Sequence, residues 1–177
     1  MHHIPFETAE VFIAGRWRPG AGGGRLMLVN PSDGQPLAEI ARGDAADVHA
    51  AVMAAQAALD GAWGSLTATE RGRLLHRMST LVLEQADELA RLEALDVGKP
   101  LRQGRADAVA LARYLEFYGG AADKVMGETI PFASGYTALT WREPHGVTAH
   151  IVPWNYPMQI IGRSVGAALA MGNACVL

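Results

Sequence analysis

The stretch that decides the fold is GVTAHIVPWNYPMQIIGR, from Gly146 to Arg163. It opens with the mostly apolar run GVTAHIV, which is typical of a strand buried in a parallel sheet. The corner PWNYP follows, and the next residues have helical periodicity to about Met171. A second apolar segment, NACVL, comes after that helix. The order strand, corner, helix, strand predicts one βαβ unit.

The corner between this strand and this helix is stiff. Pro153 fixes φ just after the strand, and Pro157 suits the first helical position and keeps Tyr156 out of the helical region. Asn155 is therefore expected at the carboxyl end of a parallel strand, where open α/β sheets bind ligands. Its amide could cap the helix, as Asn often does, or donate to an oxygen that gains negative charge during a reaction. The residues alone favour the cap.

The predicted helix also carries small residues at every fourth position: Gly162, Gly166 and Ala170. Such a stripe lets another backbone or a flat ligand come close, and close packing on a neighbouring strand is the favoured interpretation. No G-x-G-x-x-G motif follows the strand, so the dinucleotide-binding fingerprint is absent from this unit.

Upstream of this unit, short segments predict an N-terminal arm of strands. VFIAGRWRPG predicts a hairpin that turns at Ala14–Gly15. The glycine-rich GAGGGR that follows predicts a flexible turn. It does not fit a phosphate loop, because the strand-like LMLVN follows it where a helix would be needed.

Helical periodicity covers most of the chain between residues 44 and 125. Asp44 and Thr67 are each followed three residues later by an acidic side chain, which is the pattern of a capping box. The second helical region ends at DVGKP, where Gly98 can adopt the left-handed conformation. A third helix is expected from about residue 105 to residue 125, weakened in its middle by a pair of glycines.

The composition changes after the third helix. IPFASGYTALTWREPHG alternates and is rich in threonine and aromatic residues, so it predicts a strand. Tyr136, Ala138 and Thr140 would face one side of that strand, and Thr137, Leu139 and Trp141 the other.

Composition and charge exclude several classes of protein. The chain has 177 residues, of which 50% are hydrophobic and 19% charged, which is typical of a soluble globular domain. A net charge of −3 gives no reason to expect nucleic acid or an anionic membrane as a partner. No apolar run is long enough for a transmembrane helix, and the first residues lack the pattern of a signal peptide. With a single cysteine in the sequence, a reducing cytoplasm is the simplest expected compartment.

The only cysteine, Cys175, excludes an internal disulfide and a cysteine-rich zinc site, and no metal is expected. Apolar residues flank Cys175. We therefore interpret it as a buried and chemically inert side chain.

The segment REPHGVTAHIVPWNYPMQIIGRSVGAALAMGNACVL resembles the aldehyde dehydrogenase superfamily. Members of that superfamily read R-E-P-x-G-V, a short strand, P-W-N-[FY]-P, a helix and A-L-A-x-G-N. FIAGRWRPG is similar to the family's N-terminal hairpin, and VNPSDGQPLAEI to its N-P-x-[TD]-G segment. ERGRLLHRMSTLVLEQADELARLEALDVGKPL is similar to its paired helices, which end in D-x-G-K-P. The resemblance covers essentially the whole chain.

The resemblance implies an α/β fold: an incomplete Rossmann-like cofactor-binding domain with N-terminal helices and a protruding β-hairpin for oligomerisation. Residues 1–130 would form the N-terminal arm and helices, and residues 131–145 the oligomerisation hairpin. Residues 146–177 would form the first βαβ unit, truncated at Leu177. The full-length protein would be a homodimer or homotetramer.

The resemblance also implies oxidation of an aldehyde to a carboxylic acid through a cysteine thiohemiacetal, with NAD or NADP as hydride acceptor. In that family the Asn of P-W-N lies in the oxyanion hole, and this role falls on Asn155. The strand end and the corner line the family's cofactor cleft. The corresponding candidate cofactor contacts are Ile151, Val152, Pro153 and Trp154.

The resemblance is incomplete at the catalytic residues. The family's nucleophilic cysteine and its glutamate base lie far downstream, and neither position occurs in these residues. We therefore expect the 177-residue chain by itself to be inactive and poorly soluble. Two alternatives are a non-catalytic oligomerisation or binding module and a small independent dinucleotide-binding domain. The absent fingerprint argues against the second.

Overall fold

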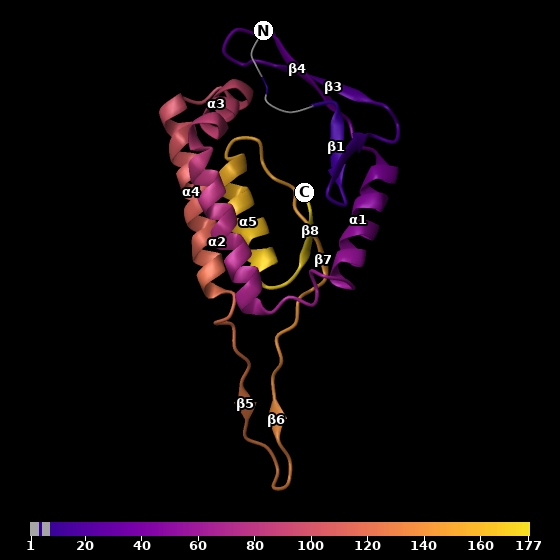
Figure 1. Cartoon of the computed structure of the whole chain (residues 1–177), viewed down its shortest axis with the longest axis vertical. Helices are drawn as coiled ribbons and strands as arrows, with labels where there is room; N and C mark the ends of the chain where they lie inside the picture. Colours follow the sequence, from indigo (N-terminus) through magenta and orange to yellow (C-terminus); the bar gives the residue numbers. More distant parts are fainter. Residues whose placement is uncertain (1–3, 5–7) are drawn as a thin grey trace.

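The computed structural model describes Ile4 and residues 8–177 (Figure 1). The N-terminal strands are β1 (Glu10–Ile13), β2 (Arg16–Pro19), β3 (Arg25–Val29) and β4 (Pro36–Ala41). The helices that follow are α1 (Ala45–Leu59), α2 (Ala68–Glu84), α3 (Ala86–Val97) and α4 (Leu101–Ala121). The C-terminal elements are β5 (Thr129–Ile130), β6 (Ala138–Leu139), β7 (Val147–Ala149), α5 (Pro157–Ala170) and β8 (Ala174–Val176).

The βαβ unit expected at the C-terminal end of the sequence is present. Strands β7 and β8 pair in parallel, with Val147 opposite Ala174 and Ala149 opposite Val176, and α5 connects them. Helices α1 and α5 lie on opposite sides of this strand pair (Figure 1). The ladder is shorter than the predicted strand. The chain leaves it after His150, whose N–H still donates to the carbonyl of Val176.

The main core lies between the helices. Helix α4 packs against α2, α3 and α5, and its apolar face is buried in the middle of this group. The buried residues of this core are Leu75, Ala86, Ala108, Leu111, Leu115, Ala122, Met158 and Ala170. Helix α5 is therefore held by the helical group on one side and by the β7–β8 pair on the other.

The small residues of α5 pack on a helix, which corrects the expectation that they face a strand. A Cβ atom on Gly162 would lie 3.0 Å from the Cβ of Tyr114, and one on Gly166 would lie 3.4 Å from the ring of Tyr118. Both tyrosines belong to α4. The stripe therefore makes room for two aromatic side chains between α4 and α5, and this packing occupies the face on which a flat ligand could have lain.

The expected helix signals are confirmed at three ends. Asp44 and Thr67 each form a complete capping box, and Gly98 has a φ of 78° at the end of α3. Helix α4 begins and ends about four residues earlier than expected. Pro100 precedes its first residue, a place where the missing N–H of proline costs no helical hydrogen bond. The glycine pair therefore lies in the last turn of α4.

The segment after α4 is a long hairpin, and the prediction of a continuous strand over residues 130–146 was wrong in extent. Only Thr129 and Ile130 pair, with Leu139 and Ala138. Figure 1 shows this hairpin projecting beyond the ends of the helices. At the other end of the chain, β1 pairs with β2 and β3 with β4 in two antiparallel hairpins. The glycine-rich segment between them forms a turn, as expected.

No helix in the described part of the chain is both long and apolar enough to cross a membrane.

Candidate functional site

The predicted site residues form one exposed loop between β7 and α5. Ile151 is 98% exposed and Trp154 is 78% exposed, whereas Val152 is half-buried. Pro153 and Asn155 are exposed as well. The loop leaves the carboxyl end of β7 and turns at residues 154–156 into the first turn of α5. Four of these five side chains are therefore exposed, and that of Val152 is half-buried.

Asn155 does not cap α5, although the residues alone favoured that role. The residue at the N-cap position is Tyr156, with φ −140° and ψ 54°, and no side chain caps the helix. Pro157 follows at the first helical position, as expected from its fixed φ. Because Asn155 lies one residue before the cap, its amide is not committed to the helix and is available to a ligand.

Beneath the corner lies a buried cluster of charged side chains that the sequence did not reveal. The ammonium group of Lys99 donates to Glu93 Oε1 at 2.8 Å and to Asp107 Oδ2 at 2.6 Å. The same group lies 4.4 Å from the centre of the Tyr156 ring. The side chains of Lys99, Glu93 and Asp107 are 9%, 3% and 0% exposed.

Asp107 joins this cluster to α5. Its Oδ1 accepts hydrogen bonds from Nε2 of Gln103 at 2.8 Å and from Nε2 of Gln159 at 2.7 Å. Gln159 is the third residue of α5 and Gln103 lies one turn before Asp107 in α4. We refer to Glu93, Lys99, Gln103, Asp107 and Gln159 as the Lys99 cluster. It connects α3, the α3–α4 connection, α4 and the first turn of α5.

The charges in the Lys99 cluster perturb one another. Burial raises the pKa of Asp107, but the hydrogen bonds from Lys99, Gln159 and Gln103 outweigh it and hold that pKa below its usual value. Burial lowers the pKa of Lys99, yet its bonds to Asp107 and Glu93 bring a net increase. Burial also raises the pKa of Glu93, and this effect exceeds the lowering by the hydrogen bond and the charge of Lys99. Lys99 pairs with both carboxylates, and the pKa values of these two partners move in opposite directions.

Glu93 is the less well satisfied carboxylate. Its Oε2 is the one buried side-chain oxygen or nitrogen without a hydrogen-bond partner among the residues that the structure describes. The sequence did contain a weak signal for this cluster. Glu93 lies one turn after the buried Ala90 in α3, and Asp107 lies one turn before the buried Leu111 in α4. Each charged residue therefore falls on the inner face of its helix. Periodicity alone could not show that Lys99 lies between them.

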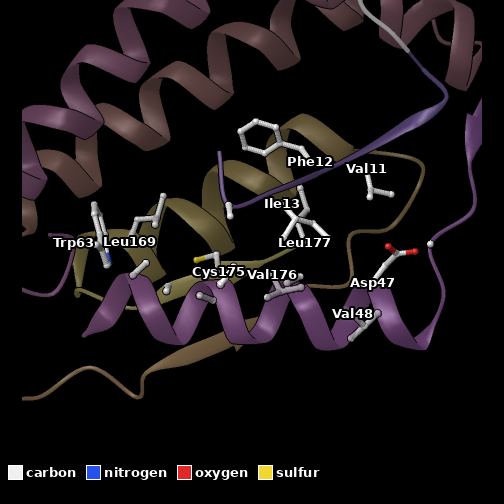
Figure 2. A pocket seen from close by; sticks show the side chains of 17 residues that line it. Val11, Phe12, Ile13, Asp47, Val48, Trp63, Leu169, Cys175, Val176 and Leu177 are labelled. Carbon is white, nitrogen blue, oxygen red and sulfur yellow. The ribbon is translucent and has the colours of Figure 1, made fainter. Parts of the chain in front are cut away.

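A large cavity lies elsewhere, between β1, α1 and β8 (Figure 2). It has a volume of about 710 Å³, and none of the predicted site residues lines it. Its lining is mainly apolar. The carboxylate of Asp47, its charged group, accepts hydrogen bonds from the N–H groups of Ala21 and Asp44. The cavity therefore offers little to a phosphate or a sugar.

Cys175 forms part of the wall of this cavity and is half-buried, so it is more exposed than the sequence suggested. Burial raises the pKa of its thiol above the ordinary value of 9.0, although a hydrogen bond from Thr148 acts in the opposite direction. The thiol is therefore protonated at neutral pH. Only the thiolate is a good nucleophile. The prediction of an inert cysteine agrees with this environment.

Comparison with known proteins gives one consistent family. The aldehyde dehydrogenase family matches residues 17–177. A hydroxyisobutyraldehyde dehydrogenase from Mycolicibacterium austroafricanum is 46% identical over 94% of this chain and 33% of its own length. A mitochondrial aldehyde dehydrogenase, family 2 member B4, from Arabidopsis thaliana is 41% identical over 98% of this chain and 33% of its own length.

Solved structures agree. A crystal structure of a Burkholderia cenocepacia protein described as an aldehyde dehydrogenase is 63% identical, with a TM-score of 0.93 over 94% of this chain and 35% of that one. The NAD⁺ complex of an aldehyde dehydrogenase from Bacillus cereus is 37% identical, with a TM-score of 0.94 over 97% of this chain and 35% of that one. The chain spans about a third of the length of these relatives. With an α/β fold that superposes on theirs and a family match over residues 17–177, this chain belongs to the aldehyde dehydrogenase family.

Proposed function

We propose that this chain is the N-terminal part of an enzyme that oxidises an aldehyde to a carboxylic acid with NAD or NADP, and that Asn155 stabilises the oxyanion of that reaction. Membership of the aldehyde dehydrogenase family over residues 17–177 is the observation that carries the proposal. The position of Asn155 supports it. The residue is exposed at the carboxyl end of a parallel strand and is not used as a helix cap.

The chemical role of Asn155 follows from charge development. When a nucleophile attacks an aldehyde, the carbonyl oxygen becomes negatively charged. An N–H donor that already points at this oxygen lowers the barrier, because it does not have to reorganise during the reaction. The nucleophile in this proposal is a cysteine outside these 177 residues, which forms a thiohemiacetal with the aldehyde. The half-buried Cys175, whose thiol pKa is raised, does not fit that role.

The corner residues also fit a nicotinamide cofactor. Ile151, Val152, Pro153 and Trp154 form an apolar, largely exposed surface beside Asn155. The first N–H groups of α5 are not capped by a side chain, which suits an anionic group nearby. When bound, NAD or NADP would accept the hydride that the substrate carbon loses. The relative from Bacillus cereus, solved as an NAD⁺ complex, supports a cofactor of this class.

The test is to replace Asn155 in the complete protein and to follow the reduction of NAD and NADP with a panel of aldehydes. Asn155→Ala should lower kcat by roughly 100- to 1,000-fold, the usual effect of removing one oxyanion donor, with a much smaller change in KM. Thermal unfolding should be nearly unchanged, because the exposed amide caps nothing. The 177-residue chain alone is the negative control and should show no turnover.

Two results would contradict this proposal. A kcat of Asn155→Ala equal to that of the wild type would remove the oxyanion role. A complete protein that turns over no aldehyde would favour the alternative of a non-catalytic module. The exposed aromatic side chains of the hairpin are the observation that supports this alternative. Whether or not the protein is an enzyme, we propose that residues 131–145 mediate its self-association to a homodimer or homotetramer.

A further inference from the structure

The hydrogen-bonding capacity of Lys99 is divided between two carboxylates and an aromatic ring. A lysine ammonium group has three N–H donors and no acceptor. Two of the donors are used by Glu93 and Asp107, and the ring of Tyr156 lies at 4.4 Å, within the range of a cation–π contact. Tyr156 is the residue directly after Asn155 and is the N-cap residue of α5. The buried charge therefore contacts the corner one residue away from the proposed oxyanion donor.

A second connection reaches the corner from the helix side. Asp107 is fully buried and accepts the amide of Gln159, which lies in the first turn of α5. Met158, the residue before Gln159, is buried in the core. The start of α5 is thus held by Met158, Gln159 and Tyr156, and no side-chain cap contributes there.

We propose that Lys99 and Gln159 are positioning residues that hold the Asn155 corner in place, an inference that rests on the proposed role of Asn155. Lys99 acts through the Tyr156 ring, and Gln159 acts through its bond to Asp107. A donor in an oxyanion hole works only if it is held within about half an ångström of its productive position. Buried ion pairs add little stability compared with apolar packing, and the best attested benefit of such groups is a defined geometry.

The first experiment measures the corner without reference to activity. Hydrogen–deuterium exchange of the complete protein, read by mass spectrometry, would be compared for peptides that cover residues 150–160. Gln159→Met keeps the length of the side chain, Lys99→Met shortens it by one atom, and both remove its polar contacts. Both should speed exchange at this corner by roughly tenfold or more, because the start of α5 then opens more often.

The matched control is Lys124→Met, which removes the only other lysine of the chain. Lys124 is exposed and pairs with Asp123 just beyond α4. Its replacement should leave exchange at residues 150–160 at the wild-type rate. If Lys99→Met does not fold, Gln159→Met still tests the inference, because it leaves the pair of Lys99 and Asp107 intact.

The second experiment separates positioning from general stability by a double-mutant cycle on kcat. In the wild-type background, Lys99→Met and Gln159→Met should each lower kcat by roughly 10- to 100-fold with little change in KM, as expected when a catalytic group is misplaced. In the Asn155→Ala background, the same changes should lower kcat by less than about threefold. No donor then remains to be positioned, so the effects are not additive.

Equal losses of kcat in both backgrounds, or wild-type exchange at residues 150–160 in both Met variants, would overturn the inference. A complete protein without aldehyde oxidation would instead contradict the proposed function. The exchange measurement would still decide whether Lys99 and Gln159 hold the corner.

Discussion

At the scale of single residues, Asp107 and Glu93 share one lysine but are not equivalent. Asp107 has no exposed surface and accepts three hydrogen bonds, from Lys99, Gln103 and Gln159. Glu93 accepts one from Lys99 and leaves Oε2 without a partner in the described part of the chain. The pKa values shift accordingly, downward for Asp107 and upward for Glu93. Folding therefore makes Asp107 a stronger acid and Glu93 a weaker acid than each is ordinarily.

Asp107→Asn should destabilise the protein by about 3 kcal/mol or more at neutral pH, because it leaves Lys99 with a single, poorly satisfied carboxylate. A lowered pKa means that the contribution of Asp107 is complete above its ordinary value of 3.8 and is lost as the pH falls through the folded-state value. The penalty should therefore be constant near neutrality and shrink only in strong acid. Urea unfolding at several pH values measures it.

Glu93→Gln is the matched variant and should change the free energy of unfolding by less than about 1 kcal/mol at neutral pH. The pKa of Glu93 is raised, so its contribution is present below the ordinary value of 4.5 and is lost as the pH rises through the folded-state value. The wild type should thus gain stability relative to Glu93→Gln as the solution is acidified. Equal effects of the two substitutions would contradict the distinct roles of the two carboxylates.

At the scale of elements, the crossing of α2 and α4 depends on two facing glycines. A Cβ atom on Gly72 would lie 2.5 Å from the carbonyl oxygen of Gly119, and one on Gly119 would lie 2.9 Å from that of Gly72. Both contacts are with backbone, which cannot move aside as a side chain can. The two helices therefore approach closely only because neither residue has a side chain, and this contact helps to place α4, which carries Asp107.

Gly119→Ala should accordingly destabilise the protein by about 1–3 kcal/mol, the usual cost of overpacking. The neighbouring Gly120 is the control, since it is exposed and a Cβ there would meet nothing within 4 Å. Gly120→Ala should be neutral or stabilise by about 0.5 kcal/mol, because alanine favours the helix over glycine. Thermal unfolding of the two variants separates packing from helix propensity, and a loss of stability in both would contradict the close crossing.

At the scale of the whole molecule, the projecting hairpin exposes large aromatic side chains. Phe132, Tyr136 and Trp141 are each more than 70% exposed, and the rings of Phe132 and Tyr136 meet edge to face. Exposed aromatic groups that lie close together are typical of surfaces that bind another protein. This exposure is the structural basis for the proposed self-association through residues 131–145.

Replacing Phe132 and Trp141 together by serine should shift the complete protein toward a smaller oligomer, because the contact loses its apolar anchors. Light scattering on a sizing column gives the mass directly. Phe117→Ser is the control, since Phe117 is also exposed but lies on α4, outside the hairpin. An unchanged mass for the double variant would contradict the proposed interface.

Local features were predictable from the sequence because neighbouring residues determine them. The capping boxes at Asp44 and Thr67, the left-handed Gly98 and the order strand, corner, helix, strand all depend on residues within a few positions of one another. The stiff corner around Asn155 belongs to this group too, since two prolines restrict it. Motifs along the chain also predicted membership of the aldehyde dehydrogenase family, and the family match over residues 17–177 confirms it.

Contacts between distant segments were decided only by the tertiary structure. The glycine stripe of α5 packs on α4, not on a strand, because the core brings Tyr114 and Tyr118 against it. Lys99 lies against the ring of Tyr156, and Asp107 accepts a hydrogen bond from Gln159, because the helices bring these distant residues together at the start of α5. Lys99 and Gln159 are separated by 60 positions in the sequence, and no periodicity relates them. Both bond to Asp107, and this shared partner depends on how the helices pack, which local propensities do not determine.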